Sequence, residues 1–295
     1  MGVRSILSLF EIREILKDYS FKIDSIYGTK NGVSDTVYIL FTNKGKFLFK
    51  LYESASFKEV ESEISLLEII SSLPVPKVIS DKNLKKIGEF REKFFVVYSF
   101  LEGESLSFAN EIHLKEIGEF LGKFHSLSEN ISIDRENRFT VFKTKELLDK
   151  VDRIDKEPFK RVFREIKNLK IEQDGLIHGD LFLDNAKFNK ERLSGVFDFS
   201  DFCRGSFLFD AGVVVASWCF KKEKFNLKLA DSFISSYNRF SNKKISLLEV
   251  LDYSIFASLF YALRRYERKS ENYLSLLKRA DILLNVKGYL WPSLL

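Results

Sequence analysis

The chain has 295 residues, of which 45% are hydrophobic and 15% are aromatic. A chain of this length and composition can bury a large core, which excludes an intrinsically disordered protein and indicates one large domain or two lobes. The 47 basic and 42 acidic residues give a net charge of +5, but they are mixed along the chain, so we expect no nucleic-acid binding.

Targeting and membrane segments are not indicated by the sequence. The N-terminal apolar run is interrupted by Glu11, which makes it too short for a signal peptide. The uncharged run at residues 211–220 has half the length needed to cross a bilayer, so it predicts a core helix. Two cysteines and three histidines cannot build a disulfide framework or a zinc site. We therefore expect a cytoplasmic protein with no membrane partner.

The N-terminal part predicts a sheet with one inserted helix. After an amphipathic helix near residues 9–16, apolar patterns predict strands at 21–27, 36–42 and 46–52, and the short gaps between them indicate antiparallel pairing. Residues 56–73 have helical spacing and end before two prolines. Further strands are expected at 77–80 and 93–100.

Helical patterns dominate from Glu111 onward. They cover residues 111–127, 144–154 and 158–169, and they resume at Phe207 after two short strands that flank a polar loop. The pattern changes at residues 100–105, which include a glycine. We predict an α+β fold with an N-terminal lobe (1–99), a hinge (100–105) and a C-terminal lobe (106–295), and a ligand cleft between the lobes.

The polar loop concentrates groups that could act together. The stretch LIHGDLFLDNAKFN contains Asp180 and Asn185, and Asp198 follows in GVFDF. Phosphoryl transfer needs one carboxylate to accept the proton of the attacking hydroxyl, and an amide oxygen with a second carboxylate to hold magnesium. We assign the first role to Asp180 and the second to Asn185 and Asp198. A single Asp or Asn in a loop is more often a turn residue, but the combination is specific.

Two further residues are interpreted as structural. His178 lies between apolar Ile177 and Gly179, so we expect it to fix the loop by hydrogen bonding rather than to act as a base. Asp210, in the segment LFDAG, is expected to tie the same loop down from the next helix.

The loop resembles the HxDxxxxN motif of the aminoglycoside phosphotransferase and choline kinase-like family, whose fold is similar to that of protein kinases. The resemblance extends over nearly the whole chain. Residues 32–53, 73–79, 192–210, SWCF at 217–220 and YALRRYE at 261–267 look like the homoserine kinase branch. The resemblance implies a bilobal protein-kinase-like fold, ATP and Mg²⁺ as cofactors, and a small-molecule hydroxyl acceptor.

The resemblance also assigns two charged residues of the N-terminal lobe. Lys50 is the third-strand lysine that contacts the nucleotide phosphates, and Glu63 on the following helix is its ion-pair partner. Alternatively, both are ordinary surface residues. We favour the first interpretation because Lys50 lies within an apolar run, where an unpaired charge would be costly.

The nucleotide loop and the adenine site leave weaker signals. Residues 28–36 lack the pattern G-x-G-x-x-G, but Gly32 permits close approach of phosphate, and Ser34 or Thr36 can donate a hydroxyl. A plain hairpin turn explains these residues almost as well. Adenine is expected against residues 98–101, including Ser99 and Leu101.

An amino-acid acceptor needs a cation for its carboxylate and an anion for its ammonium group near Asp180. We assign Arg264 to the carboxylate and Asp201 to the ammonium group. Alternatively, Arg264 is an exposed residue paired with a neighbouring Glu, and Asp201 caps the helix that begins near Ser206. Aminoglycosides call for a wide acidic surface, and the C-terminal hundred residues have no acidic cluster, which favours a small acceptor.

The leading hypothesis is an ATP- and magnesium-dependent kinase that phosphorylates the side-chain hydroxyl of L-homoserine, a step of threonine biosynthesis. Alternatives keep the fold and change the acceptor to an aminoglycoside, choline, a sugar or methylthioribose. A non-catalytic kinase-like binding protein is disfavoured because Lys50, Asp180, Asn185 and Asp198 are all present. The oligomeric state and the choice between ATP and GTP stay open.

Overall fold

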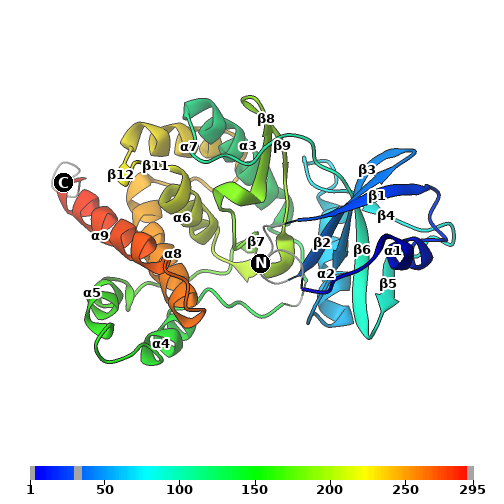
Figure 1. The fold of residues 1–295 in the computed structure, drawn as a ribbon. Helices are drawn as coiled ribbons and strands as arrows, with labels where there is room; N and C mark the ends of the chain where they lie inside the picture. Colours follow the sequence, from blue (N-terminus) through cyan, green and yellow to red (C-terminus); the bar gives the residue numbers. More distant parts are fainter. Residues whose placement is uncertain (1–3, 30–34, 134, 291–295) are drawn as a thin grey trace. The chain divides into compact units, whose positions relative to one another are not determined.

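The computed structural model describes residues 4–29, 35–133 and 135–290 (Figure 1). The chain forms two compact units. Unit 1 comprises residues 1–102 with 195–200, and unit 2 comprises residues 103–194 with 201–295. The change from unit 1 to unit 2 after Glu102 falls within the interval predicted as the hinge. The assignment of residues 195–200 to unit 1 was not predicted, because it depends on packing between distant parts of the chain.

Unit 1 is built on an antiparallel sheet with the strand order β1-β2-β3-β6-β4, and β5 pairs with β6 (Figure 1). The strands are β1 (Ile23–Gly28), β2 (Thr36–Thr42), β3 (Gly45–Leu51), β4 (Val78–Ile79), β5 (Ile87–Phe90) and β6 (Lys93–Ser99). The unit also contains two helices, α1 (Leu9–Ile15) and α2 (Phe57–Ile69). The predicted strands and helices are present, whereas the short strand β5 was not predicted.

Strand β3 has an apolar side chain on one face of the sheet and the charged side chain of Lys50 on the other. Phe49 is fully buried in an apolar cluster that includes Ile12 and Leu40. Successive residues of a strand point to opposite faces, so the next residue, Lys50, projects away from this cluster. Lys50 pairs with Val37 on β2 and with Val96 on β6, in the interior of the sheet.

Helix α2 starts at a capping box. The side chain of Ser56 accepts a hydrogen bond from the backbone N–H of Glu59, and the Glu59 carboxylate accepts one from the backbone N–H of Ser56 at 2.8 Å. These contacts satisfy backbone groups that a helix start leaves unpaired. The start of α2 is thereby fixed, and Glu63 lies on its buried face with Val60 and Leu67.

Unit 2 is mainly helical, with short antiparallel strand pairs. Its helices are α3 (Glu111–Ser128), α4 (Val141–Asp149), α5 (Lys156–Ile166), α6 (Phe207–Trp218), α7 (Leu227–Phe240), α8 (Leu247–Glu267) and α9 (Tyr273–Leu290). Its strand pairs are β7 (Gly175–Ile177) with β10 (Cys203–Gly205), β8 (Ala186–Asn189) with β9 (Arg192–Val196), and β11 (Phe220–Lys221) with β12 (Lys224–Phe225). The last two residues of β9 already belong to unit 1. Helix α3 packs on α7, and α8 packs on both α6 and α9 (Figure 1).

Helix α6 is the core helix that the uncharged run predicted, since every one of its residues is buried. The uncharged run is too short to span a membrane. Among the helices that the structure describes, none is long and apolar enough for such a span. The predicted α+β class, with an antiparallel sheet in the N-terminal part and helices in the C-terminal part, is confirmed.

Candidate active site

Lys50 lies among three carboxylates in unit 1. Its Nζ is 3.5 Å from Oδ2 of Asp35, 3.5 Å from Oε1 of Glu63 and 3.5 Å from Oδ1 of Asp198. It also donates a hydrogen bond to the hydroxyl of Ser200 at 3.3 Å. The structure therefore brings Lys50 to Glu63, the residue that the sequence assigned as its partner, and adds Asp35 and Ser200, which the sequence analysis missed.

The charges in this cluster do not cancel. The side chains of Lys50 and Glu63 are only 9% and 5% exposed, whereas that of Asp198 is 41% exposed. Burial by itself lowers the pKa of Lys50. The nearby carboxylates of Glu63, Asp198 and Asp35 raise this pKa by more than burial lowers it, so the lysine remains charged. Three carboxylates beside one ammonium group leave an excess of negative charge, which suits a divalent cation.

Asp198 has a backbone conformation that is rare for its residue type. Its φ angle is +64°, in the left-handed region that non-glycine residues seldom adopt. The Ser200 hydroxyl donates a hydrogen bond to its Oδ1. Such conformations cost energy and are frequent at functional sites. The partly exposed carboxylate is therefore held by its neighbours and remains accessible.

Asp180 and Asn185 are joined within unit 2. The Nδ2 group of Asn185 donates to the backbone oxygen of Asp180 at 2.7 Å and to its Oδ2 at 3.0 Å. An asparagine side chain has two N–H donors and one carbonyl oxygen. Because both donors are directed at Asp180, the Oδ1 atom of Asn185 is the atom of this side chain that could bind a metal ion. The same contacts orient the Asp180 carboxylate.

Asp210 holds the backbone of this loop from α6. Its carboxylate accepts hydrogen bonds from the backbone N–H of His178 at 2.7 Å and from that of Gly179 at 2.8 Å. The backbone N–H of Asp180 donates to Nδ1 of His178 at 3.2 Å. Tyr261 donates its hydroxyl to the carbonyl oxygen of Gly179, whose φ is +82°. The backbone N–H and the carbonyl oxygen of Gly179 are thus both hydrogen bonded. These bonds fix the backbone of the residue that precedes Asp180.

Asp210 is in turn bonded to a buried histidine that the sequence analysis did not assign. His125 Nε2 lies 3.2 Å from Oδ2 of Asp210, and His125 Nδ1 lies 2.9 Å from the hydroxyl of Tyr237. Burial lowers the pKa of His125 although Asp210 opposes this, so the imidazole is neutral at pH 7. It therefore donates to Asp210 and accepts from Tyr237. A polar residue on the apolar face of the predicted helix 111–127 was the signal in the sequence.

Of the three residues predicted in the nucleotide loop, the structure describes only Thr36. Gly32 and Ser34 lie outside the described residues. Thr36 is fully buried, and its hydroxyl accepts from the backbone N–H groups of Arg4 and Ser5 at 3.0 and 2.8 Å and bonds to Glu53. This hydroxyl is therefore used inside unit 1, and we do not propose it further as a phosphate contact.

The predicted adenine segment ends strand β6. The Ser99 hydroxyl accepts a hydrogen bond from the backbone N–H of Lys77 at 2.9 Å, and the Ser99 backbone N–H donates to the Lys77 carbonyl at 2.8 Å. Leu101 follows and is partly buried. These contacts fix the backbone of the segment, while its role toward adenine stays a prediction.

The two residues assigned to the acceptor have different surroundings. Asp201 forms an ion pair with Arg138, whose NH1 lies 3.0 Å from its Oδ1. Arg264 is partly buried on α8. The alternative cap role of Asp201 is filled by another residue, because the backbone N–H of Phe207 at the start of α6 donates to Asp174 at 2.9 Å.

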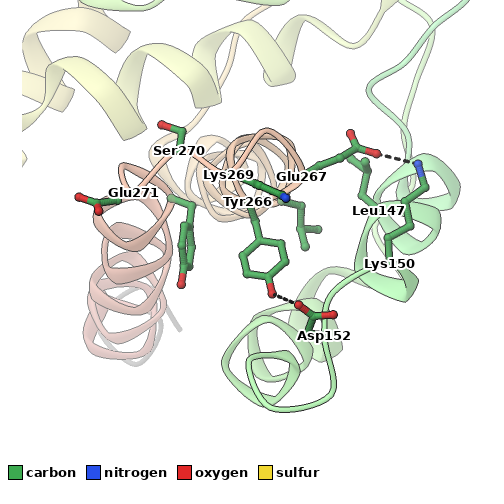
Figure 2. A pocket seen from close by; sticks show the side chains of 10 residues that line it. Leu147, Lys150, Asp152, Tyr266, Glu267, Lys269, Ser270 and Glu271 are labelled. Atoms are coloured by element: carbon green, nitrogen blue, oxygen red, sulfur yellow. Dashed lines mark hydrogen bonds and ion pairs between the residues drawn. The ribbon is translucent and has the colours of Figure 1, made fainter.

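A pocket of about 430 Å³ lies elsewhere in unit 2 (Figure 2). It is lined by residues of α4, α8 and the turn into α9, namely Leu147, Lys150, Asp152, Leu263, Tyr266, Glu267, Lys269, Ser270, Glu271 and Tyr273. On α8, Tyr261 and Arg265 are four residues apart and contact the loop of Asp180 at Gly179 and Phe182. Tyr266 lies on another face of the helix, and its hydroxyl donates to Asp152 at 3.1 Å in this pocket. The pocket is thus separate from the loop of Asp180.

Comparison with protein families identifies the chain. Residues 28–237 match the model of APH, the phosphotransferase enzyme family. The chain belongs to this family. Among the curated relatives of this phosphotransferase is a protein named homoserine kinase from Bartonella henselae. It is 29% identical over 254 residues, which cover 81% of this chain and 79% of the relative.

Solved structures confirm the kinase-like fold of this phosphotransferase. A spectinomycin phosphotransferase in complex with ADP and spectinomycin superposes with a TM-score of 0.65 at 13% identity, covering 95% of both chains. A choline kinase from Streptococcus pneumoniae superposes with a TM-score of 0.66 at 16% identity, covering 93% of this chain and 98% of the other.

Proposed function

We propose that this phosphotransferase transfers the γ-phosphate of ATP to the side-chain hydroxyl of L-homoserine. The observation that carries the chemistry is the pair formed by Asp180 and Asn185 at the family's loop motif. The acceptor is supported by the relatives named homoserine kinase, including those from Bartonella henselae and Agrobacterium fabrum. Because homoserine has a carboxylate, an ammonium group and a hydroxyl, its binding needs charges of both signs near Asp180.

In the proposed reaction, the hydroxyl oxygen of the acceptor attacks the γ-phosphorus atom. A new O–P bond forms, the bond between that phosphorus and the bridging oxygen of the β-phosphate breaks, and ADP leaves with the electron pair. Asp180 orients the hydroxyl and accepts its proton. Lys50, held by Glu63, binds phosphate oxygens of the nucleotide. Residues 98–101 are proposed to contact adenine, and residues 100–105 to link the nucleotide-binding and acceptor-binding lobes.

We propose Mg²⁺ as the metal and Asn185 and Asp198 as its protein ligands. When bound, magnesium neutralises charge on the transferring phosphates. Mg²⁺ is usually held by one or two carboxylates and substrate phosphates, with water completing the shell. The excess of carboxylate around Lys50 and the direction of the Asn185 side chain fit such an ion. In the described ranges, no group of three His, Cys, Asp or Glu side chains is arranged to hold a metal alone, so a site completed by phosphate fits better.

The cytoplasm is the proposed compartment. Cys203 and Cys219 are both buried and unbridged, which suits a reducing environment. ATP and free amino acids are available there as substrates.

An acceptor screen tests the proposed function. ADP release by the purified protein would be followed with MgCl₂ and ATP in the presence of homoserine, choline, methylthioribose, a sugar or an aminoglycoside. We expect acceptor-dependent ADP release to be fastest with homoserine and to disappear with EDTA. Faster release with another acceptor would reassign the substrate, and no acceptor dependence at all would contradict a kinase.

A further inference from the structure

An ion pair lies at the surface of unit 2 beside the catalytic loop. Arg138 NH1 is 3.0 Å from Oδ1 of Asp201. The two side chains are 45% and 35% exposed, so a small ligand in solution can reach both charged groups. Surface ion pairs of this kind contribute little to stability, which makes a purely structural role a weak explanation for the pair.

The pair is close to Asp180 because the ring of Phe139 and the backbone oxygen of Asp201 both lie near Gly179. A side-chain carbon added at Gly179 would lie 2.5 Å from the ring of Phe139, the residue after Arg138, and 3.1 Å from the backbone oxygen of Asp201. Tyr261 is near the same groups, since the carboxylates of Asp180 and Asp201 raise its pKa in addition to the effect of burial. Arg138 thus directly precedes a residue whose ring lies against Gly179, and the backbone oxygen of Asp201 lies near the same glycine.

The backbone that carries Arg138 is well anchored. The ring of Phe139 stacks on Phe209 with 4.4 Å between centroids and meets Phe260 edge-on at 5.2 Å. The backbone N–H of Phe139 donates to Oδ1 of Asn137 at 2.7 Å. Thr140 then caps the start of α4. The guanidinium group is therefore presented from an ordered position, which reduces the entropy lost when a ligand binds.

We propose that Arg138 and Asp201 form a zwitterion clamp for the acceptor. In this inference, which rests on the proposed function, Arg138 binds the α-carboxylate of homoserine and Asp201 binds its α-ammonium group. A guanidinium group pairs with a carboxylate through two parallel hydrogen bonds. Binding of the zwitterion replaces the one ion pair of the free protein with two. Sequence reasoning gave the carboxylate to Arg264, whereas Arg138 is the arginine that the structure pairs with Asp201.

The clamp also explains selectivity among alcohols. Choline and aminoglycosides carry positive charge and no carboxylate, so they gain nothing from Arg138 and are repelled by it. Rejection of a competitor by a like charge is a common source of specificity. An acceptor of this site is therefore expected to need both a carboxylate and an ammonium group.

The test uses homoserine and two analogues that each lack one charge. Steady-state kinetics would give the KM for homoserine, and 3-aminopropan-1-ol and 4-hydroxybutanoate would be measured as competitive inhibitors. Arg138→Gln should raise the KM for homoserine and the Ki of 4-hydroxybutanoate by about 10- to 100-fold, the usual effect of a hydrogen-bonded ion pair. The Ki of 3-aminopropan-1-ol should stay the same or fall. Asp201→Asn should give the opposite pattern for the two analogues.

Controls separate the clamp from a general loss of structure or charge. Arg268→Gln removes an exposed arginine at the end of α8 and should leave all constants within twofold. Arg138→Lys should recover part of the affinity for 4-hydroxybutanoate.

Equal changes for both analogues in Arg138→Gln, or a KM within twofold of the wild type, would overturn the clamp. If Arg264→Gln alone gave the pattern expected for Arg138→Gln, the carboxylate would belong to Arg264. A wild-type protein that does not phosphorylate homoserine would instead contradict the proposed function.

Discussion

The side chains of His125 and Asp210 are hydrogen bonded at 3.2 Å although they are 85 residues apart, and neither is exposed to solvent. The Asp210 carboxylate accepts hydrogen bonds from two backbone N–H groups of the loop that leads to Asp180, and His125 is bonded to Asp210. A chain of contacts therefore leads from α3 through α6 to the residue before Asp180. Buried networks of this kind are stable only when every member is paired.

Asp210→Asn should damage both the catalytic loop and the fold. The amide retains one oxygen but turns an N–H₂ group toward a backbone N–H or toward His125, which leaves buried donors unpaired. We expect a loss of about 2–4 kcal/mol in the free energy of unfolding and at least a tenfold lower kcat. Urea unfolding and steady-state kinetics measure the two effects. Asp231→Asn, at an exposed position of α7, should change neither. A variant with wild-type stability and kcat would show that Asp210 does not support the loop.

The stability of the protein should depend on pH through His125. Burial holds the pKa of this histidine below its ordinary value of 6.5 in the folded state. When the pH falls below about 6.5, the unfolded chain therefore binds a proton that the folded chain does not bind, and folding is disfavoured by up to about 1.4 kcal/mol per pH unit. The loss stops once the pH falls below the folded-state pKa.

His125→Gln removes this titration. The variant should be less stable at pH 7.5 because Asp210 and Tyr237 lose their partner, but the difference from the wild type should shrink between pH 6.5 and 5. Urea midpoints across this range measure the difference. Parallel curves for the two proteins would mean that folding does not lower the pKa of His125.

Lys50→Ala should act on the nucleotide. It removes the cation that we propose for the phosphates and takes the shared partner away from Asp35, Glu63 and Asp198. We expect a KM for ATP about 10-fold higher or more, a lower kcat, and a lower melting temperature. Lys44→Ala, at an exposed position in the turn before the same strand, is the matched control and should behave as the wild type. A change confined to the KM of the acceptor would show that Lys50 does not contact ATP.

Asp180→Asn should separate catalysis from binding. The substitution keeps the size of the side chain but removes the carboxylate that we propose as the proton acceptor. The kcat should fall by about 10² to 10⁴-fold, while calorimetry should show ATP binding unchanged. Asp184→Asn, at an exposed position on the same loop, should keep full activity.

His178→Ala should mainly lower the melting temperature. Full kcat in Asp180→Asn, or a stable but inactive His178→Ala protein, would mean that the base is assigned wrongly.

Features set by neighbours in the sequence could be predicted. Asp180 and Asn185 are five positions apart on one loop, and Lys50 and Glu63 lie on a strand and the helix that follows it, so short stretches of chain bring each pair together. The alternating apolar residues of β2, β3 and β6 likewise predicted the sheet, because local periodicity reflects which face is buried.

Contacts between distant segments could not be predicted. His125 and Tyr237 are 112 positions apart, and Arg138 and Asp201 are 63 apart. A single sequence shows that each of these residues is polar but not which partner the fold supplies. Thr36 shows the same limitation. Its sequence position suggested a hydroxyl that could bind phosphate, but this hydroxyl is hydrogen bonded to the backbone N–H of Arg4 and to Glu53.

Identification of the phosphorylated product tests whether the protein phosphorylates homoserine. The purified protein would be incubated with ATP, MgCl₂ and L-homoserine, and the mixture followed by ³¹P NMR and mass spectrometry, with Asp180→Asn as the blank. We predict O-phosphohomoserine and ADP in equal amounts with the wild type and neither above background with the variant. Consumption of ATP without a phosphate on homoserine, or the same product from Asp180→Asn at the wild-type rate, would contradict the account.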